Sequence, residues 1–291
     1  MRNIGKIIEA GAQRFKGKLG VGYKDLQTGE EYFYNGSRKF YMASTFKLFV
    51  LIAFYERVMK GELDEDTVYT VQDSDYISSS TFLHPYYPRR DFKLSELAML
   101  MMILSDNAST DIIWKHTGAE NIARIVKETG SMNTTVTKDC KAILSGYYNI
   151  LDTDSDEEIK RKMTYSDEVT DRDNISTPSD VTHVFELLYN NRILNEKYCR
   201  RILEIMSCCL LNARMPSFFP IDGYAAHKTG TIDGYTNDVG IVFTPKGNYV
   251  LVFYCTSPVT GNMARSVYGE EFLATLSREI YDAFVENAGE R

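Results

Sequence analysis

The pattern of hydrophobic and polar positions predicts a helix at the N-terminal end, followed by two strands. Residues 3–15 carry apolar side chains at helical spacing, which is typical of an amphipathic helix with one buried face. Two runs rich in strand-forming residues follow at 19–23 and 31–34, and a turn around Thr28 and Gly29 joins them. We therefore expect two paired strands next to the first helix.

Strand patterns return only near the C-terminal end. The runs 240–243 and 249–254 flank a turn-rich segment and predict an antiparallel hairpin, and 267–287 predicts a final helix. Helical patterns dominate from about 67 to 217. The sequence therefore predicts an α/β fold of the α+β type, in which an antiparallel sheet is flanked by helices and an all-helical subdomain is inserted.

We expect a single domain over residues 1–291. In this prediction, 1–66 and 218–291 form the sheet-containing subdomain, and 67–217 forms the helical subdomain. A crevice forms where two such parts meet, and ligand sites favour junctions of this kind.

Composition narrows the classes of partner. The chain has 291 residues, 44% of them hydrophobic, and a net charge of −7, which is typical of a folded globular protein and unfavourable for binding nucleic acid. The longest apolar runs, 48–55 and 97–104, are too short to cross a bilayer, and the first residues lack the uninterrupted apolar stretch of a secretory signal. We expect a monomer with no nucleic-acid partner and no membrane span, and the compartment stays open.

Cysteine and histidine positions indicate neither a metal site nor a disulfide framework. The five cysteines are odd in number and follow no ligand spacing, and the four histidines form no ligand pair at helical spacing. A phosphate-binding glycine loop is also missing. We expect no metal, no cofactor and buried cysteines.

Ser44 and Lys47 open a helix whose continuation, 48–54, is apolar on every side and should be buried. Positions three apart share a helix face, so the Lys47 amine can lie beside the Ser44 hydroxyl. A hydroxyl is a weak nucleophile without a base, and burial lowers the pKa of a lysine so that it can act as one. The alternative is that Ser44 caps the helix and Lys47 reaches water.

Ser105-Asp106-Asn107 stands between two predicted helices. These residue types are common helix caps, which gives the plain interpretation. The functional interpretation makes the Ser105 hydroxyl a proton carrier and the Asn107 amide a hydrogen-bond partner of a substrate.

Lys228-Thr229-Gly230-Thr231 offers an ammonium and a hydroxyl to a carboxylate, and Gly230 allows a substrate backbone to approach. The Thr231 N–H would donate to an oxyanion. The alternative is a strand that ends in a glycine turn.

Together the three motifs, in the order Ser44, Ser105, Lys228, match the S-x-x-K, S-D-N and K-T-G set of class A β-lactamases and penicillin-binding proteins. The sequence resembles this serine acyltransferase superfamily, and the class A branch most closely. The resemblance covers nearly the whole chain and extends to four further segments: Phe40-Tyr41-Met42-Ala43, Leu94-Ser95-Glu96-Leu97, Ser176-Thr177-Pro178 and Thr236-Asn237-Asp238.

The resemblance implies a role for each motif residue. It makes Ser44 the nucleophile, Lys47 the proton acceptor in acylation and Ser105 the proton relay. It makes Asn107 a contact of the substrate amide. Lys228 and Thr229 would hold the substrate carboxylate, and the N–H groups of Ser44 and Thr231 would form the oxyanion hole.

The loop after the second motif departs from the class A pattern. Class A enzymes place there a glutamate, in a Glu-Pro-x-x-Asn context, that activates the deacylating water, and this chain has no such pentapeptide. Counting forward from Asn107 reaches Lys141, and counting back from Thr177 and Pro178 reaches Arg161, so about 20 residues are inserted between these anchors. We consider four acids as substitutes, with surface acids as the plain alternative: Asp139, Glu157, Glu158 and Glu168. Class A enzymes also commonly use an arginine on the substrate carboxylate, and Arg265 lies in the matching stretch.

Three functions follow from this sequence. The first is a β-lactamase-type serine hydrolase that opens a β-lactam amide through an acyl-Ser44 intermediate, with slow deacylation. The second is a D-Ala-D-Ala peptidase, transpeptidase or esterase of the same superfamily, acting on a peptidoglycan-like peptide or an ester. The third is a module that binds or senses a β-lactam or cell-wall fragment without turnover.

Overall fold

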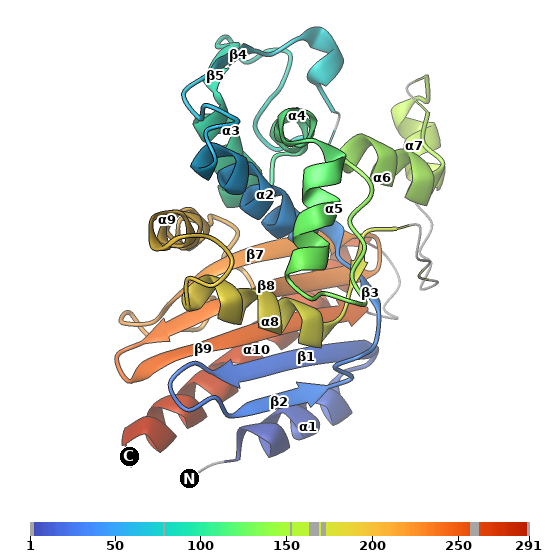
Figure 1. The fold of residues 1–291 in the computed structure, drawn as a ribbon. Coiled ribbons are helices and arrows are strands. Elements are labelled where there is room, and N and C mark those ends of the chain that lie inside the picture. Colours follow the sequence, from blue (N-terminus) through green and yellow to red (C-terminus); the bar gives the residue numbers. More distant parts are fainter. Residues whose placement is uncertain are drawn as a thin grey trace.

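A five-stranded antiparallel sheet is built from both ends of the chain in the computed structural model, which describes residues 3–77, 79–151, 153–162, 169, 173–256 and 262–289. The strand order is β2-β1-β9-β8-β7 (Figure 1). The five strands are β1 (Lys18–Asp25), β2 (Glu31–Tyr34), β7 (Tyr224–Ile232), β8 (Tyr235–Thr244) and β9 (Gly247–Thr256). Because β1 pairs with β9, residues more than 200 positions apart form the middle of the sheet.

Both faces of the sheet are buried, and β9 shows why its sequence is almost continuously apolar. Tyr249, Leu251 and Phe253 pack into the core on one face, whereas Val250 and Val252 pack into the core on the other. Successive side chains of a strand point to opposite faces, so a strand buried on both faces needs apolar residues at every position.

Helices cover the sheet on both faces (Figure 1). On one face α1 (Ile4–Arg14) lies beside α10 (Asn262–Gly289), and these two helices close the smaller core. On the other face α8 (Pro178–Tyr189) packs on β9 and β1, and α9 (Glu196–Ser207) packs on β7.

The helical region lies on the same side of the sheet as α8 and α9. Its buried central helix, α2, follows a short 3₁₀ helix, η1, and α4, α5 and α9 pack around it. The remaining elements are η1 (Ala43–Phe46), α2 (Lys47–Met59), η2 (Asp73–Asp75), α3 (Leu94–Ile103), α4 (Asn107–Thr117), α5 (Ala119–Glu128), α6 (Cys140–Tyr148) and α7 (Asp156–Lys162), with the short strand pairs β3 (Phe40–Tyr41) with β6 (Ile175–Ser176) and β4 (Val68–Thr70) with β5 (Asp91–Lys93).

These elements confirm the predicted fold class and both hairpins. The alternative in which Lys228–Thr231 is a strand that ends in a glycine turn is wrong. The motif lies inside β7, and Tyr235 continues the ladder after a tight turn at Gly234. Residues 152–158 are rich in acidic side chains, and this composition favours a solvated loop. That interpretation is wrong for the end of the stretch, because α7 begins at Asp156, and Ser155 and Glu158 exchange capping hydrogen bonds there.

The division into two subdomains stays a prediction. Within the described residues, every helix is too short or too polar to pass through a lipid bilayer.

Candidate active site

Ser44 lies in η1, directly after the strand β3, and its side chain is half-buried. The backbone before it is held from two sides: Asn237 Nδ2 donates to Tyr41 O at 2.8 Å, and Met42 N donates to Asn174 O at 3.0 Å. Ala43 has a φ of 45°, a left-handed conformation that costs free energy for any residue with a Cβ atom. The hydrogen bonds around it keep this strained turn in place and so fix the direction of Ser44.

Lys47 is fully buried directly after η1. In a 3₁₀ helix, side chains three positions apart lie in line, which places Lys47 on the Ser44 side of the chain. Its Nζ atom donates to Ser105 O at 2.7 Å, to Asn107 Oδ1 at 2.8 Å and to Ser105 Oγ at 3.3 Å. Burial lowers the pKa of Lys47, with Cys140, Asp106 and Asp111 acting in the opposite direction. The alternative in which Lys47 reaches water is therefore wrong.

The three residues of the second motif, Ser105, Asp106 and Asn107, make different contacts. Asp106 is the cap: its carboxylate accepts from Ser109 N at 2.7 Å and from the loop amides of Phe82 and Leu83 at 2.8 and 3.0 Å. Ser105 takes a left-handed φ of 57° before that cap, and the turn directs it toward Lys47. The capping interpretation thus holds for Asp106, while Ser105 and Asn107 face the site.

Asn107 connects three side chains around the site. Its Oδ1 accepts from Lys47 Nζ at 2.8 Å and from Cys140 Sγ at 3.3 Å, and its Nδ2 donates to Ser79 Oγ at 2.9 Å. The amide is held on both sides, so the position of Asn107 is fixed independently of any substrate.

Strand β7 passes directly over η1. A Cβ atom at Gly230 would lie 2.6 Å from Met42 O and 3.2 Å from Ser44 N, so only glycine allows this approach without a shift. Lys228, two positions earlier, is fully buried and donates from Nζ to Thr229 O at 2.8 Å. Burial and the positive charge of Lys47 lower the pKa of Lys228 to about 7.

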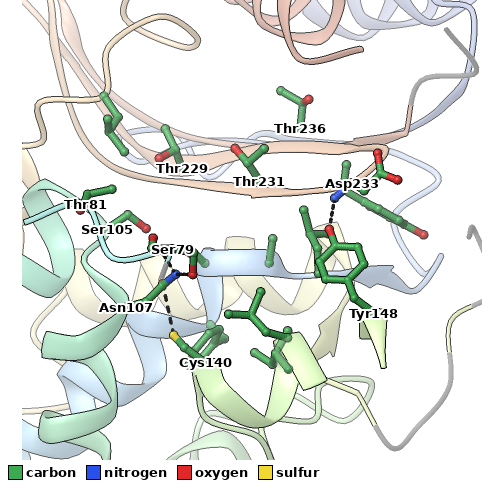
Figure 2. A pocket seen from close by; sticks show the side chains of 18 of the residues that line it. Ser79, Thr81, Ser105, Asn107, Cys140, Tyr148, Thr229, Thr231, Asp233 and Thr236 are labelled. Atoms are coloured by element: carbon green, nitrogen blue, oxygen red, sulfur yellow. Dashed lines mark hydrogen bonds between the residues drawn. The ribbon is translucent and has the colours of Figure 1, made fainter. Parts of the chain in front are cut away.

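A cavity of about 410 Å³ joins the three motifs. Ser44, Ser105, Asn107, Thr229 and Thr231 line it. Figure 2 shows Ser105 and Asn107 on one side and Thr229 and Thr231 on the other. Three residues of the predicted site are not part of this lining and lie next to it: Lys47, Lys228 and Gly230. Such a cavity can hold a small acyl donor against Ser44.

Comparison with known proteins agrees with this geometry. The model of the Beta-lactamase2 family, described as the beta-lactamase enzyme family, matches residues 3–284. The chain belongs to this β-lactamase family. The resemblance found from the three motifs is thereby confirmed.

Individual relatives of this β-lactamase family member are distant. The β-lactamase SME-1 of Serratia marcescens is 24% identical over 85% of the chain and 78% of the relative. Other curated β-lactamases match over only 38–44% of their own length. The same fold occurs in a β-lactamase from Sphaerobacter thermophilus (TM-score 0.79, 21% identity, 97% and 96% of the two chains). It also occurs in the L158E mutant of PBP-A in an acyl-enzyme complex with penicillin-G (TM-score 0.78, 23% identity, 97% and 96%).

Arg214, which no sequence motif indicated, clamps the third motif of this β-lactamase family member. Its guanidinium is buried and donates to Gly230 O at 3.1 Å and to Asn237 O at 2.7 Å. It also contacts Thr231 Oγ1 and pairs with Glu270 at 3.1 Å. Gly230 C=O and Thr231 N–H belong to one planar peptide group, so Arg214 fixes the direction of that N–H. The loop around Arg214 carries no motif, and only the fold places it here.

Helix α6 forms one wall of the cavity, beside Asn107. Cys140, Ile143, Leu144 and Tyr148 line the cavity from this helix. The forward count from Asn107 reached Lys141, one residue beyond Cys140, so spacing alone came close to this position. Burial raises the pKa of the Cys140 thiol, which therefore stays protonated near neutral pH.

The acids proposed as substitutes are used elsewhere or lie outside the described residues. Asp139 caps α6 by accepting from Ala142 N at 2.8 Å, Glu158 accepts from Ser155 N at 2.9 Å, and Glu157 is exposed. Glu168 and the side chain of Arg265 lie outside the described part of the chain.

Two further acids lie nearby. Asp111 accepts from Cys140 N at 2.7 Å and from Lys141 N at 3.0 Å, so it anchors the start of α6. Burial and the neighbouring carboxylate of Asp139 raise the pKa of Asp111 to about 6. Asp233 lines the cavity beyond Thr231, at the turn that follows β7.

Four of the five cysteines are buried, as expected. Cys140, Cys199, Cys209 and Cys255 are buried, whereas Cys208 is exposed at the end of α9, so the prediction of burial was wrong there. Within the described residues, no cluster of three or more His, Cys, Asp or Glu side chains is arranged to hold a metal ion.

Proposed function

We propose that this protein is a serine hydrolase that opens a β-lactam amide through an acyl-Ser44 intermediate and releases the acyl group slowly. The observation that carries the proposal is the meeting of Ser44, Ser105 and Thr231 in one cavity, above the buried amine of Lys47. These residues come from three segments that are far apart in the sequence, and acyl transfer needs a nucleophile, a base and an oxyanion donor at one place.

In the proposed acylation, the Ser44 hydroxyl attacks the lactam carbonyl while its proton passes to neutral Lys47. The proton then moves through Ser105 Oγ, which lies 3.3 Å from Lys47 Nζ, to the amide nitrogen as the C–N bond breaks. The N–H groups of Ser44 and Thr231 stabilise the oxyanion. Lys228 and Thr229 hold the carboxylate that β-lactams carry beside this nitrogen.

In this proposal the acyl group is released slowly because the cavity wall around Cys140 supplies no good base. Deacylation needs a base within about 3 Å of its water. The Cys140 thiol next to Asn107 is protonated and walled by apolar side chains, so it is a poor base. The PBP-A structure of similar fold supports the acylation half of the scheme, since it is an acyl-enzyme complex with penicillin-G.

Intact-mass spectrometry tests this function. The protein is mixed with benzylpenicillin and sampled over hours, with Ser44→Ala as the control. We expect an adduct of one whole penicillin on the wild type, since ring opening loses no atoms, and none on the variant. The adduct should leave slowly. A folded wild-type protein that never gains an adduct contradicts the proposal, and turnover too fast to trap contradicts slow release.

The protonated Cys140 thiol beside Asn107 also favours a second candidate, a peptidase, transpeptidase or esterase of this superfamily. Such an enzyme forms a lasting penicillin adduct. Release of D-alanine from an acyl-D-Ala-D-Ala peptide, without nitrocefin turnover, would support that function. An adduct that never leaves, with no turnover of peptide or ester, would support a module that only captures the β-lactam.

A further inference from the structure

The position of Gly230 over Ser44 divides the cavity into two ends along β7. Thr229 and buried Lys228 lie on one side of this crossing, and Ile232 and Asp233 lie on the other. The first end offers the Thr229 hydroxyl to a carboxylate, and the amine of buried Lys228 lies behind this lining. An acyl donor held with its carbonyl at Ser44 therefore extends the rest of its acyl group toward Ile232.

One face of α6 forms the wall at that second end. Ile143, Leu144 and Tyr148 all line the cavity, and Leu144 and Tyr148, four positions apart, share one face of the helix. Ile232 and Tyr235 face them from the sheet side. Tyr148, Ile232 and Tyr235 are each less than one-tenth exposed, so their apolar surface is packed before any ligand enters.

A hydrogen bond ties the two walls together. Asp233 N donates to Tyr148 Oη at 2.7 Å, and Figure 2 shows the Tyr148 ring reaching across to the turn after β7. Both groups are buried, so loss of this bond would leave a backbone N–H unsatisfied. The bond limits how far the walls can separate and so limits the size of the group between them.

We propose that this end is an apolar subsite that selects acyl donors with a short alkyl or aryl acyl group and disfavours charged ones. The inference rests on the proposed function, since it needs acylation of Ser44. A methylene moved from water into such a wall gains about fourfold in affinity, whereas a charged group loses hydration without gaining a charged partner of opposite sign from Ile143, Leu144, Tyr148 or Ile232. Among the described residues of this lining, Asp233 is the one with a charged side chain. A cationic acyl donor tests whether this carboxylate attracts it.

The test compares p-nitrophenyl esters that differ only in the acyl group: acetate, butyrate, hexanoate, the anionic monosuccinate and the cationic 6-aminohexanoate. The rate of Ser44 acylation is measured from the nitrophenol burst and confirmed by intact mass, and the Ser44→Ala protein supplies the background. We expect the rate to rise about fourfold per methylene from acetate to hexanoate. Both charged esters should react at least tenfold more slowly than hexanoate.

Leu144→Asn should reduce the ratio of the hexanoate rate to the acetate rate by about tenfold. Ser145→Asn is the matched control, since it adds the same amide to the neighbouring exposed position of α6 and should keep the ratio. Equal rates for all esters, or a faster 6-aminohexanoate, would overturn the subsite while leaving the acyl-Ser44 proposal intact. Failure of every ester and of penicillin to label Ser44 would overturn both.

Discussion

Lys47 Nζ lies 2.8 Å from Asn107 Oδ1, and this pair links the first motif to the second across the floor of the cavity. The ammonium form fills its three donor positions with Ser105 and Asn107. In the proposed acylation, loss of one proton lets the same nitrogen accept the proton of the Ser44 hydroxyl. Burial favours this loss, since it disfavours the charged form.

Replacement of this base should stop acylation without unfolding the protein. We expect Lys47→Met to lower the rate of penicillin adduct formation by about 10²–10⁴-fold, the usual contribution of a positioned base. Thermal denaturation should show a midpoint close to that of the wild type, because the variant removes a buried charge and keeps an unbranched side chain only one atom shorter. Lys115→Met, at an exposed position of α4, is the control. Acylation of Lys47→Met within threefold of the wild-type rate would refute this role.

The pH dependence should differ between anionic and neutral acyl donors. Lys228 has a lowered pKa of about 7, so it loses its positive charge as pH rises through that value. For penicillin, kcat/KM for acylation should therefore fall above pH 7, by up to tenfold per pH unit, whereas a neutral ester without a carboxylate should show no such fall. As pH rises through the lowered pKa of Lys47, both donors should gain rate, because only the neutral amine can accept a proton.

Lys228→Arg separates these effects. A guanidinium stays protonated over this whole range, so the fall above pH 7 should disappear for penicillin while the acidic limb remains. A fall of equal size with the neutral ester would show that the alkaline limb belongs to another group.

Arg214 should act as a positioning residue for the oxyanion donor. Arg214→Lys keeps the positive charge but cannot reach Gly230 O, Asn237 O and Glu270 with one planar group. We expect acylation by penicillin and by the neutral ester to fall together by about tenfold, since both form the same oxyanion. Arg278→Lys, a surface pair with Asp282, is the control. A loss confined to penicillin would instead assign Arg214 to the carboxylate.

A carboxylate at position 140 should accelerate release of the acyl group. The Cys140 thiol is 3.3 Å from Asn107 Oδ1, so a longer acidic side chain there reaches the space beside the acyl-Ser44 carbonyl. We expect the penicillin adduct of Cys140→Glu to decay about 10²-fold faster than that of the wild type, measured by intact mass. Cys140→Ser, which adds no acid, should decay at the wild-type rate. An unchanged lifetime in a folded Cys140→Glu protein would show that the wall does not limit deacylation.

Periodicity predicted most of the elements because each depends on its own residues. The two hairpins needed only alternating apolar residues and turn-forming segments, and the buried helix after Ser44 needed only its apolar run. The sequence left the end of the third motif open, because Gly230 and Gly234 both permit a turn. Only pairing with β8 decides that the chain turns at Gly234.

The inserted loop could not be predicted in the same way. Its hydrophobic residues, such as Ile143 and Leu144, fit a helix, but a helix of nine residues gains its stability from packing rather than from its own sequence. Asp111 on α4 supplies that support by accepting two amides at the start of α6. No local pattern connects Asp111 with position 140.

The sequence by itself determined the family, the three motifs and the kinds of chemical group available, because residue identity sets which atoms can attack, donate or carry charge. The tertiary structure decided that Lys47 and Lys228 lose contact with water, that Arg214 clamps the Gly230 peptide, and that α6 lines the cavity with a thiol and apolar side chains. The burial of a side chain, its direction and its distance from other groups depend on segments far apart in the chain. These segments become neighbours only when strands from both ends of the chain pair in one sheet.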